Sequence, residues 1–221
     1  VLTDISFTAE PGETTAIIGS TGSGKSSIVN LIPRLYDVTG GQILFDGVDI
    51  RDMDMKVLRD HIGFVPQKGV LFSGTIKSNI LFGGKGDEST MEMAARTAQA
   101  ADFINAKEEG YDSHIAQGGS NVSGGQKQRL AIARAIAKDP EVYIFDDSFS
   151  ALDYRTDKVL RSALKKQVGN ATVIIVAQRI STILHAEKII VLDEGRIVGI
   201  GTHEELLKTN EQYQQIALSQ L

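Results

Sequence analysis

The chain has 221 residues, of which 42% are hydrophobic and 23% are charged, a composition typical of one large globular domain. Its formal net charge of −5 argues against a dedicated nucleic-acid-binding protein, because such domains usually carry a clustered basic excess. The absence of cysteine excludes disulfides and thiolate metal sites and suits a reducing compartment. No apolar run approaches the ~20 residues that a membrane-spanning helix needs, so a membrane role would require a partner or further segments.

The first third of the chain is predicted to consist mainly of short strands. Strands are expected at residues 2–8, 14–18, 42–45, 48–50 and 62–65. The hairpin at 42–50 is indicated by Asp46-Gly47, which suits a type I′ turn, and Pro66 closes the strand at 62–65. One helix is expected in this part, at 26–32.

The middle of the chain is predicted to be helical, and strands then return. From about residue 74 to 137 no convincing strand is predicted, and helices are expected at 75–81, 88–101 and 126–137. The remaining strands are expected at 142–145, 172–176, 188–192 and 196–200, with helices at about 155–167 and 204–218. Strands that alternate with helices imply a largely parallel sheet, so the expected fold class is α/β with an inserted helical subdomain.

One stretch matches the pattern G-x-x-x-x-G-K-[ST] at every fixed position. Its residues are Gly19, Ser20, Thr21, Gly22, Ser23, Gly24, Lys25 and Ser26. It lies between a predicted strand and a predicted helix, which is the context of a phosphate-binding loop rather than of a flexible Gly/Ser-rich linker. The glycines let successive N–H groups turn inward, and the helix N-terminus adds the positive end of its dipole. Lys25 is therefore expected on the β- and γ-phosphates and Ser26 on Mg²⁺.

A second candidate site follows the apolar strand at 142–145, which ends in Asp146 and Asp147. Polar residues at the carboxyl end of a buried parallel strand commonly serve ligands. Asp146 is the predicted Mg²⁺ partner, directly or through water, and Asp147 is placed to polarise an attacking water. The alternative interpretation is that the two aspartates cap the next helix.

A third candidate site is the start of the predicted helix at 126–137. Ser123 and Gln126 form a capping-box pattern, which by itself predicts only a well-capped helix. Gly124 and Gly125 are not needed for a cap, and each glycine within a helix costs roughly 1 kcal/mol relative to alanine. Exposed N–H groups there would make a second anion site.

With these motifs assembled, the chain resembles the nucleotide-binding domain of an ABC transporter over essentially its whole length. The resembling segments, in family order, are the Walker A loop at 19–26, the Q-loop at Gln67, the signature motif at 121–126, the Walker B strand at 142–146 and the D-loop at 150–153. Residues 70–80 resemble the exporter branch in particular. The resemblance implies a P-loop NTPase (RecA-like) core at 1–67 and 138–221 with an antiparallel β subdomain, and a helical subdomain at 68–137. An N-terminal strand and a transmembrane domain would lie outside this sequence.

The resemblance also implies ATP and Mg²⁺ as ligands. It adds Ser27 and Gln67 to the nucleotide site and assigns Ser26, Gln67 and Asp146 to the metal. The signature residues Ser123, Gly124, Gly125 and Gln126 would reach the ATP of a partner domain, and Asp153 would serve as the D-loop aspartate.

The partners that the resemblance implies are a second nucleotide-binding domain, stacked head to tail, and transmembrane domains with coupling helices. Two ATPs would lie between the paired domains, at the cytoplasmic face of the cell membrane, and dimer closure would drive the transmembrane helices. No nucleic acid is expected as a partner.

Two positions depart from the family pattern. Asp147 stands where the family has a general-base Glu, and Gln178 stands where the switch loop has His. Asp is about 1.5 Å shorter than Glu, and Gln cannot carry the charge of an imidazole. We therefore expect a weakly hydrolytic site on this chain and an intact signature that completes a competent site of an unlike partner, as in a heterodimeric exporter.

Two other classes of protein fit part of the pattern. A non-transport ABC ATPase that acts on nucleic acid or ribosomes would use the same motifs, but such proteins usually carry a long coiled coil or basic arms, and the segment between Gln67 and Ser123 is short and not notably basic. A P-loop kinase would need neither a signature motif nor a D-loop. A domain that binds ATP without turnover is a variant of the transporter hypothesis.

Overall fold

A computed structural model describes residues 2–220 of the chain, which form two compact units. The first unit takes the chain up to Phe64, Glu141–Asp147 and the chain from Asn170 onward. The second takes Val65–Pro140 and Ser148–Gly169. Within residues 2–220, no helix is both long enough and apolar enough to cross a membrane.

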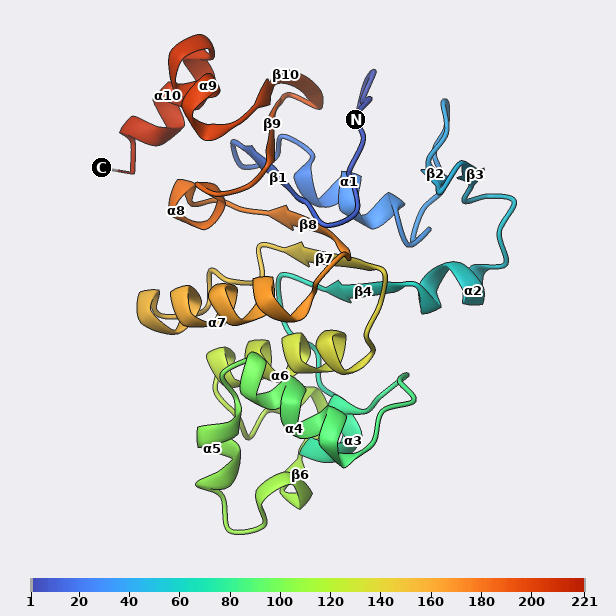
Figure 1. The fold of residues 1–221 in the computed structure, drawn as a ribbon, viewed down its shortest axis with the longest axis vertical. Helices are drawn as coiled ribbons and strands as arrows, with labels where there is room; N and C mark the ends of the chain where they lie inside the picture. Colours follow the sequence, from blue (N-terminus) through green and yellow to red (C-terminus); the bar gives the residue numbers. More distant parts are fainter. Residues whose placement is uncertain (1, 221) are drawn as a thin grey trace. The chain divides into compact units, whose positions relative to one another are not determined.

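The first unit is built on a six-stranded sheet with the order β10-β9-β1-β8-β7-β4 (Figure 1). The strands are β1 (Thr14–Gly19), β4 (Ile62–Val65), β7 (Val142–Asp146), β8 (Thr172–Val176), β9 (Lys188–Asp193) and β10 (Arg196–Gly201). β1 pairs in parallel with β8 and β9, β7 pairs in parallel with β8, and β10 is antiparallel to β9. The α/β fold class with a mainly parallel sheet is thus confirmed.

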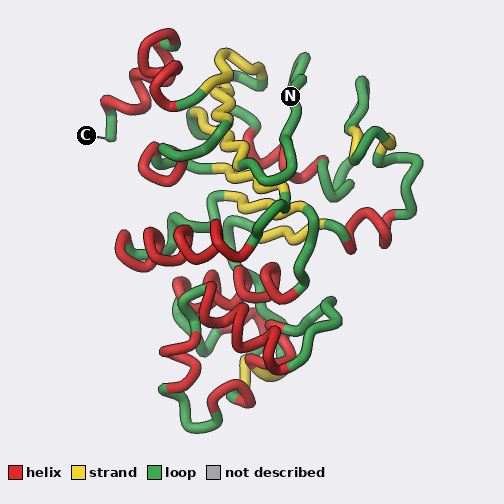
Figure 2. The backbone as a smooth tube through the Cα atoms, in the orientation of Figure 1, coloured by secondary structure: helices red, strands yellow, loops and turns green. Residues whose placement is uncertain are grey.

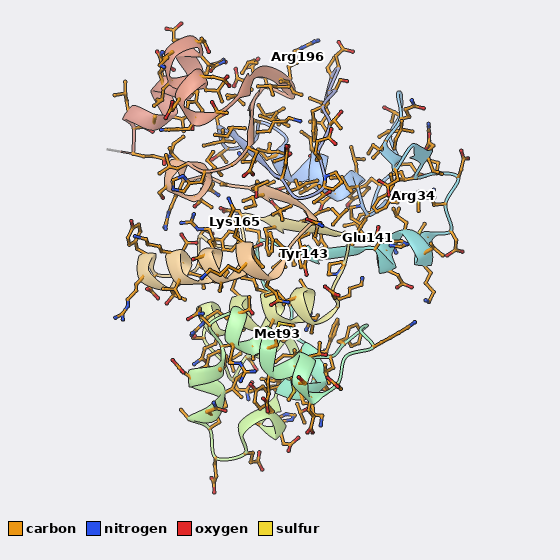
Figure 3. The ribbon with its side chains drawn as sticks, in the orientation of Figure 1. Arg34, Met93, Glu141, Tyr143, Lys165 and Arg196 are labelled. Atoms are coloured by element: carbon orange, nitrogen blue, oxygen red, sulfur yellow. The ribbon has the colours of Figure 1, made fainter. Side chains whose placement is uncertain are left out.

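The sheet is held by central strands whose inner residues are apolar and buried. Ile17, Ile144, Ile174 and Ile190 are buried in one cluster, and Tyr143, labelled in Figure 3, stacks on Phe145 with ring centroids 6.2 Å apart. Strands covered on both faces read as continuous hydrophobic runs, and all six strands of this sheet lie where the sequence predicted a strand.

Short helices and one hairpin complete the first unit. The helices are α1 (Lys25–Leu31), α2 (Met55–Asp60), α8 (Ile180–Ile183), α9 (His203–Thr209) and α10 (Glu211–Leu218). The predicted hairpin is present as β2 (Leu44–Phe45) and β3 (Val48–Asp49), with positive φ at both Asp46 and Gly47, as a type I′ turn requires. Arg34, labelled in Figure 3, donates to the Ile50 carbonyl (3.2 Å) and so ties the loop after α1 to the hairpin.

Two predictions for the first unit were wrong. Residues 2–8 form no strand: Leu2, Ile5 and Phe7 pack against the core, but the segment lacks a paired ladder and makes only isolated contacts such as Thr3 N to Gly195 O (2.9 Å). The tail is not one helix, because Asn210 ends α9 and its side chain caps α10 at Tyr213 N (2.8 Å). Neither α2 nor α8 was predicted, although Asp54 caps the start of α2.

The second unit is mainly helical, as Figure 2 shows. Its elements are β5 (Gly74–Thr75), α3 (Ile76–Ile80), α4 (Glu88–Thr97), α5 (Ala101–Asn105), the 3₁₀ turns Gly110–Asp112 and Gln117–Gly119, β6 (His114–Ile115), α6 (Gly124–Ala137) and α7 (Tyr154–Gln167). The expectation of no strand here was wrong, because β5 and β6 pair as a two-stranded sheet. The predicted helix at 88–101 is also interrupted, since Gln99 adopts φ 58° between α4 and α5.

The domain boundaries drawn from the sequence stay a prediction. The compact units differ from them at residues 65–67, 138–140 and 148–169, the last of which include α7: all three segments group with the helical segment rather than with the sheet. α7 packs against α4 within that unit.

Candidate functional site

The loop at residues 19–26 joins β1 to α1, as the motif predicts. Gly22 and Gly24 adopt φ of 82° and 102°, which favour glycine. At Gly19 the reason for glycine is space, since a Cβ there would lie 2.1 Å from the Leu192 carbonyl oxygen. Glycine is therefore required at these positions, and at Gly19 it allows the loop to lie against β9.

Lys25 lies at the first position of α1 with its ammonium turned back over the loop. Nζ donates to the carbonyls of Gly19 (2.8 Å) and Ser20 (2.7 Å). Burial lowers the pKa of Lys25, while the nearby carboxyls Asp147 and Asp146 act in the opposite direction. Backbone carbonyls thus hold the ammonium at the loop, and a negatively charged phosphate oxygen, which is a stronger acceptor, can replace them.

Asp146 and Ser26 meet although 120 residues separate them. Val176 of β8 pairs with Asp146, the last residue of β7, and with Ile17 of β1, which ends two residues later. The carboxyl ends of these three parallel strands therefore lie together. The Ser26 hydroxyl donates to Asp146 Oδ1 (3.0 Å), and Asp146 is only 6% exposed. Burial raises the pKa of Asp146, and the hydrogen bond from Ser26 opposes that rise.

This pair of oxygens fits a magnesium ion. Mg²⁺ prefers hard oxygen ligands and is usually held by one or two protein groups together with water and phosphate oxygens. Ser26 and Asp146 offer a hydroxyl and a carboxylate in contact with one another beside the phosphate loop. The third predicted metal residue, Gln67, belongs to the second unit, so its role at the metal stays a prediction.

The two residues that depart from the family pattern bind one another. Gln178 Nε2 donates to Asp147 Oδ2 at 2.7 Å. Asp147 is 7% exposed, adopts φ 49°, and its N–H donates to the Val176 carbonyl (2.9 Å), so the residue is fixed at backbone and side chain alike. The side-chain amide of Gln178 is thus directed at Asp147.

The loop after Gln178 is braced by a residue that the sequence did not single out. Gln220 Nε2 donates to the Gln178 carbonyl (2.7 Å), and Gln220 Oε1 accepts from Ile180 N (2.8 Å). The two glutamines lie 42 positions apart in the sequence and no local pattern connects them, so only the folded chain identifies this contact.

The second unit holds the signature residues at the start of α6. Ser123 Oγ accepts from Gln126 N (3.2 Å) and Gln126 Oε1 accepts from Ser123 N (3.1 Å), so the capping box is present as predicted. A Cβ on Gly124 would meet nothing within 4 Å, and one on Gly125 would make an ordinary contact with Ala151 O at 3.5 Å. The chain itself therefore does not require glycine at either position.

The remaining predicted residues of the second unit lie in two loops. Asp153 caps α7 by accepting from Thr156 N (2.9 Å) and the Thr156 hydroxyl (2.6 Å). Gln67 is exposed in the loop that follows β4. Each loop is anchored by a buried polar residue that the sequence analysis missed, namely Ser148 and Gln128.

Comparison with known proteins places the chain in a family. The profile of the family described as "ABC transporter" matches residues 2–150. An uncharacterized ABC transporter ATP-binding protein of Mycobacterium tuberculosis is 51% identical over 224 residues, covering 100% of this chain and 38% of the relative. A putative multidrug export ATP-binding/permease protein of Staphylococcus aureus is 46% identical over 218 residues, covering 98% of this chain and 38% of the relative.

A solved structure of an ABC exporter has the same fold as this chain. The structure of a bacterial Atm1-family ABC exporter with ATP bound superposes with a TM-score of 0.94 at 41% identity, over 97% of this chain and 38% of that one. The chain thus spans 38% of the length of the relatives that it matches. It belongs to the ABC transporter family, and its α/β P-loop fold is that of the nucleotide-binding domain of an exporter-type member.

Proposed function

We propose that this chain is the ATP-binding motor domain of an ABC exporter. Mg²⁺-ATP would be bound by residues 19–27, with Lys25 on the phosphates and with Ser26 and Asp146 as metal ligands, joined by Gln67. The contact between Ser26 and Asp146 and the folded-back Lys25 support this assignment. The bound ion would neutralise negative charge on the phosphates.

We further propose that the chain's own site hydrolyses ATP only weakly, and the contact between Gln178 and Asp147 carries this proposal. A general base needs a carboxylate within hydrogen-bond reach of the attacking water. Asp147 Oδ2 is engaged by an amide at 2.7 Å, and its shorter side chain places the carboxylate about 1.5 Å further back than that of Glu. Loss of a well-placed general base costs on the order of 10²–10⁴-fold in rate, while nucleotide binding is retained.

The signature residues would complete the competent site of a second nucleotide-binding domain. Ser123, Gly124, Gly125 and Gln126 form a regular, capped helix start whose glycines leave the backbone uncovered. Such a helix start binds anions. Because the chain's own catalytic residues are altered and its signature is not, the partner would be a different chain, and the assembly would be a heterodimer with one degenerate site.

The transmembrane domains would dock on an exposed aromatic patch of the second unit, formed by Val70, Phe72, Phe82 and Arg134. Phe72 and Phe82 are 45% and 55% exposed, with ring centroids 4.5 Å apart. The guanidinium of Arg134 lies 5.0 Å from the Phe72 ring and donates to the carbonyls of Val70 and Asn79 (both 2.9 Å). An exposed aromatic pair on a rigid base is typical of an interaction surface, and the permease portion of the relatives is the natural occupant.

The proposal is tested by restoring the family residues in the full heterodimer. With Asp147→Glu and Gln178→His combined, we expect the ATPase rate to rise at this chain's site, measured with the partner's own catalytic glutamate changed to glutamine so that only this site contributes. The single control Lys208→Met, on an exposed turn of α9, should change nothing. A wild-type site that already turns over as fast as the restored one would refute the degenerate-site assignment, and failure to retain Mg²⁺-ATP would refute nucleotide binding.

A further inference from the structure

The side chain of Gln128 joins the signature helix to the loop that carries Gln67. Gln128 lies in α6, five residues after Ser123, and is 1% exposed. Its Oε1 accepts from Gly69 N (2.9 Å) and its Nε2 donates to the Pro66 carbonyl (3.1 Å). Both ends of one amide therefore bind backbone groups on either side of Gln67.

The loop lies directly on the helix at this point. A Cβ on Gly69 would be 3.0 Å from the Lys127 carbonyl oxygen and 3.2 Å from Gln128 Oε1, so a larger residue would push the loop away. Residues 66–69 form no helix or strand, so no ladder of backbone hydrogen bonds fixes them. The Gln128 amide supplies the pairing that secondary structure does not, and it leaves Gln67 exposed between the two anchors.

A second hydrogen bond holds the chain just before the loop that carries Gln67. Ser148, which is fully buried, donates from Oγ to the Val65 carbonyl (2.8 Å), one residue before the loop. The segment that follows Ser148 approaches the helix start, where Gly125 faces the Ala151 carbonyl. Three functional loops of the second unit, at Gln67, Ser123 and Asp153, are thus connected through buried polar groups.

We propose that Gln128 is a positioning residue that makes the Gln67 loop and the signature helix start move as one body. Buried polar groups cost free energy unless they are satisfied, and an apolar side chain would fill the space without that cost. The amide at Gln128 instead specifies where the loop lies on the helix. This inference rests on the proposed function: Gln67 would respond to nucleotide in the chain's own site, and α6 would carry that response to the site completed with the partner.

The test is a double-mutant cycle in the full transporter, with ATPase rate and half-saturating ATP concentration as readouts. Gln128→Met keeps the side-chain volume and removes both hydrogen bonds. We expect the maximal ATPase rate to fall about tenfold, since allosteric coupling typically changes affinities about 5- to 150-fold. The half-saturating ATP concentration should change by less than about twofold. Gln67→Asn combined with Gln128→Met should be no slower than Gln67→Asn alone, because both act through one loop.

Two outcomes would overturn the inference: losses that multiply in the double variant, or an unchanged rate in Gln128→Met. The matched control is Gln99→Met, since Gln99 is a glutamine of the same unit whose half-buried side chain donates to Arg96 O (3.0 Å) and holds no loop. If Gln128→Met fails to fold, Gln128→Asn replaces it, because the shorter amide cannot reach both anchors. Failure of the wild type to bind Mg²⁺-ATP would instead contradict the proposed function, so the two failures are distinguishable.

Discussion

Single residues of the phosphate loop are under opposing demands of folding and binding. Lys25 places an ammonium in a buried position, where two backbone carbonyls hold it. Desolvation of a charge is unfavourable, and carbonyl oxygens replace only part of the lost hydration. The residue is therefore expected to serve the ligand at some cost to the folded state, as is common in functional sites.

Lys25→Met should separate these two effects. Because a hydrogen bond between charged groups contributes about 1.5–3 kcal/mol, we expect ATP binding to weaken by roughly 10- to 150-fold. The ligand-free protein should melt at the same temperature or higher, since a buried charge has been removed. Titration calorimetry and thermal unfolding measure the two quantities, and the exposed Lys208→Met serves as the control. An unchanged affinity, or a lower melting temperature, would contradict the expectation.

Some residues of the site could be predicted from a local sequence motif, and others could not. Gly19–Ser26 and the capping box of Ser123 were predictable because each motif is built from neighbours along the chain. The contact of Gln178 with Asp147 spans 31 residues and that of Gln128 with Pro66 spans 62, so both depend on the completed fold. Sequence alone identified Gln178 as unusual, but not its partner.

At the scale of elements, the strands were predictable where burial is continuous and not where pairing decides. β7, β8, β9 and β10 lie where the apolar runs predicted them. Residues 2–8 alternate apolar and polar side chains but form no ladder, whereas β5 and β6 are only two residues each and pair although they lie far apart in the sequence. Hydrophobic pattern reports burial, while a ladder requires a partner.

Helix α6 offers a test of whether its glycines serve the fold. A Cβ on Gly124 would meet nothing within 4 Å, so Gly124→Ala should stabilise the protein by about 0.4–1 kcal/mol through reduced freedom of the unfolded chain. The ATPase rate of the proposed heterodimer should nevertheless fall at least about tenfold, since a methyl group would separate the helix start from the nucleotide that it is proposed to contact. Urea unfolding and steady-state ATPase assays check both. A variant that is both stabilised and fully active would show that the glycine has no ligand.

The last described turn of the chain braces the loop after Gln178. Removing the Gln220 side chain in Gln220→Ala should accelerate amide exchange at Ile180 by about fivefold, the effect of one hydrogen bond worth about 1 kcal/mol. Gln215→Ala, an exposed position of α10, is the matched control and should leave Ile180 unchanged. Exchange at Ile180 that is the same in all three proteins would show that the brace does not persist in solution.

For the molecule as a whole, the compact units carry different parts of the chemistry. The first unit contains the phosphate loop, both aspartates and Gln178, and the second contains Gln67, the signature residues and the aromatic patch. Neither unit holds a complete set of the predicted functional residues. The proposed motor function requires such a division of the functional residues between two bodies.

The aromatic patch gives the prediction that belongs to this scale. Phe82→Ala should weaken association with the transmembrane domains at least about tenfold, because burying a phenylalanine side chain contributes about 1.5–3 kcal/mol. Mg²⁺-ATP affinity of the first unit should stay unchanged, since Phe82 belongs to the second. Arg134 should keep its charge in the variant, because burial lowers its pKa only to about 10. Co-purification and transport assays measure the loss, with Leu44→Ala, an exposed apolar residue of the first unit, as control. If Phe82→Ala assembles and transports like the wild type, the patch is not the surface that binds the proposed transmembrane domains.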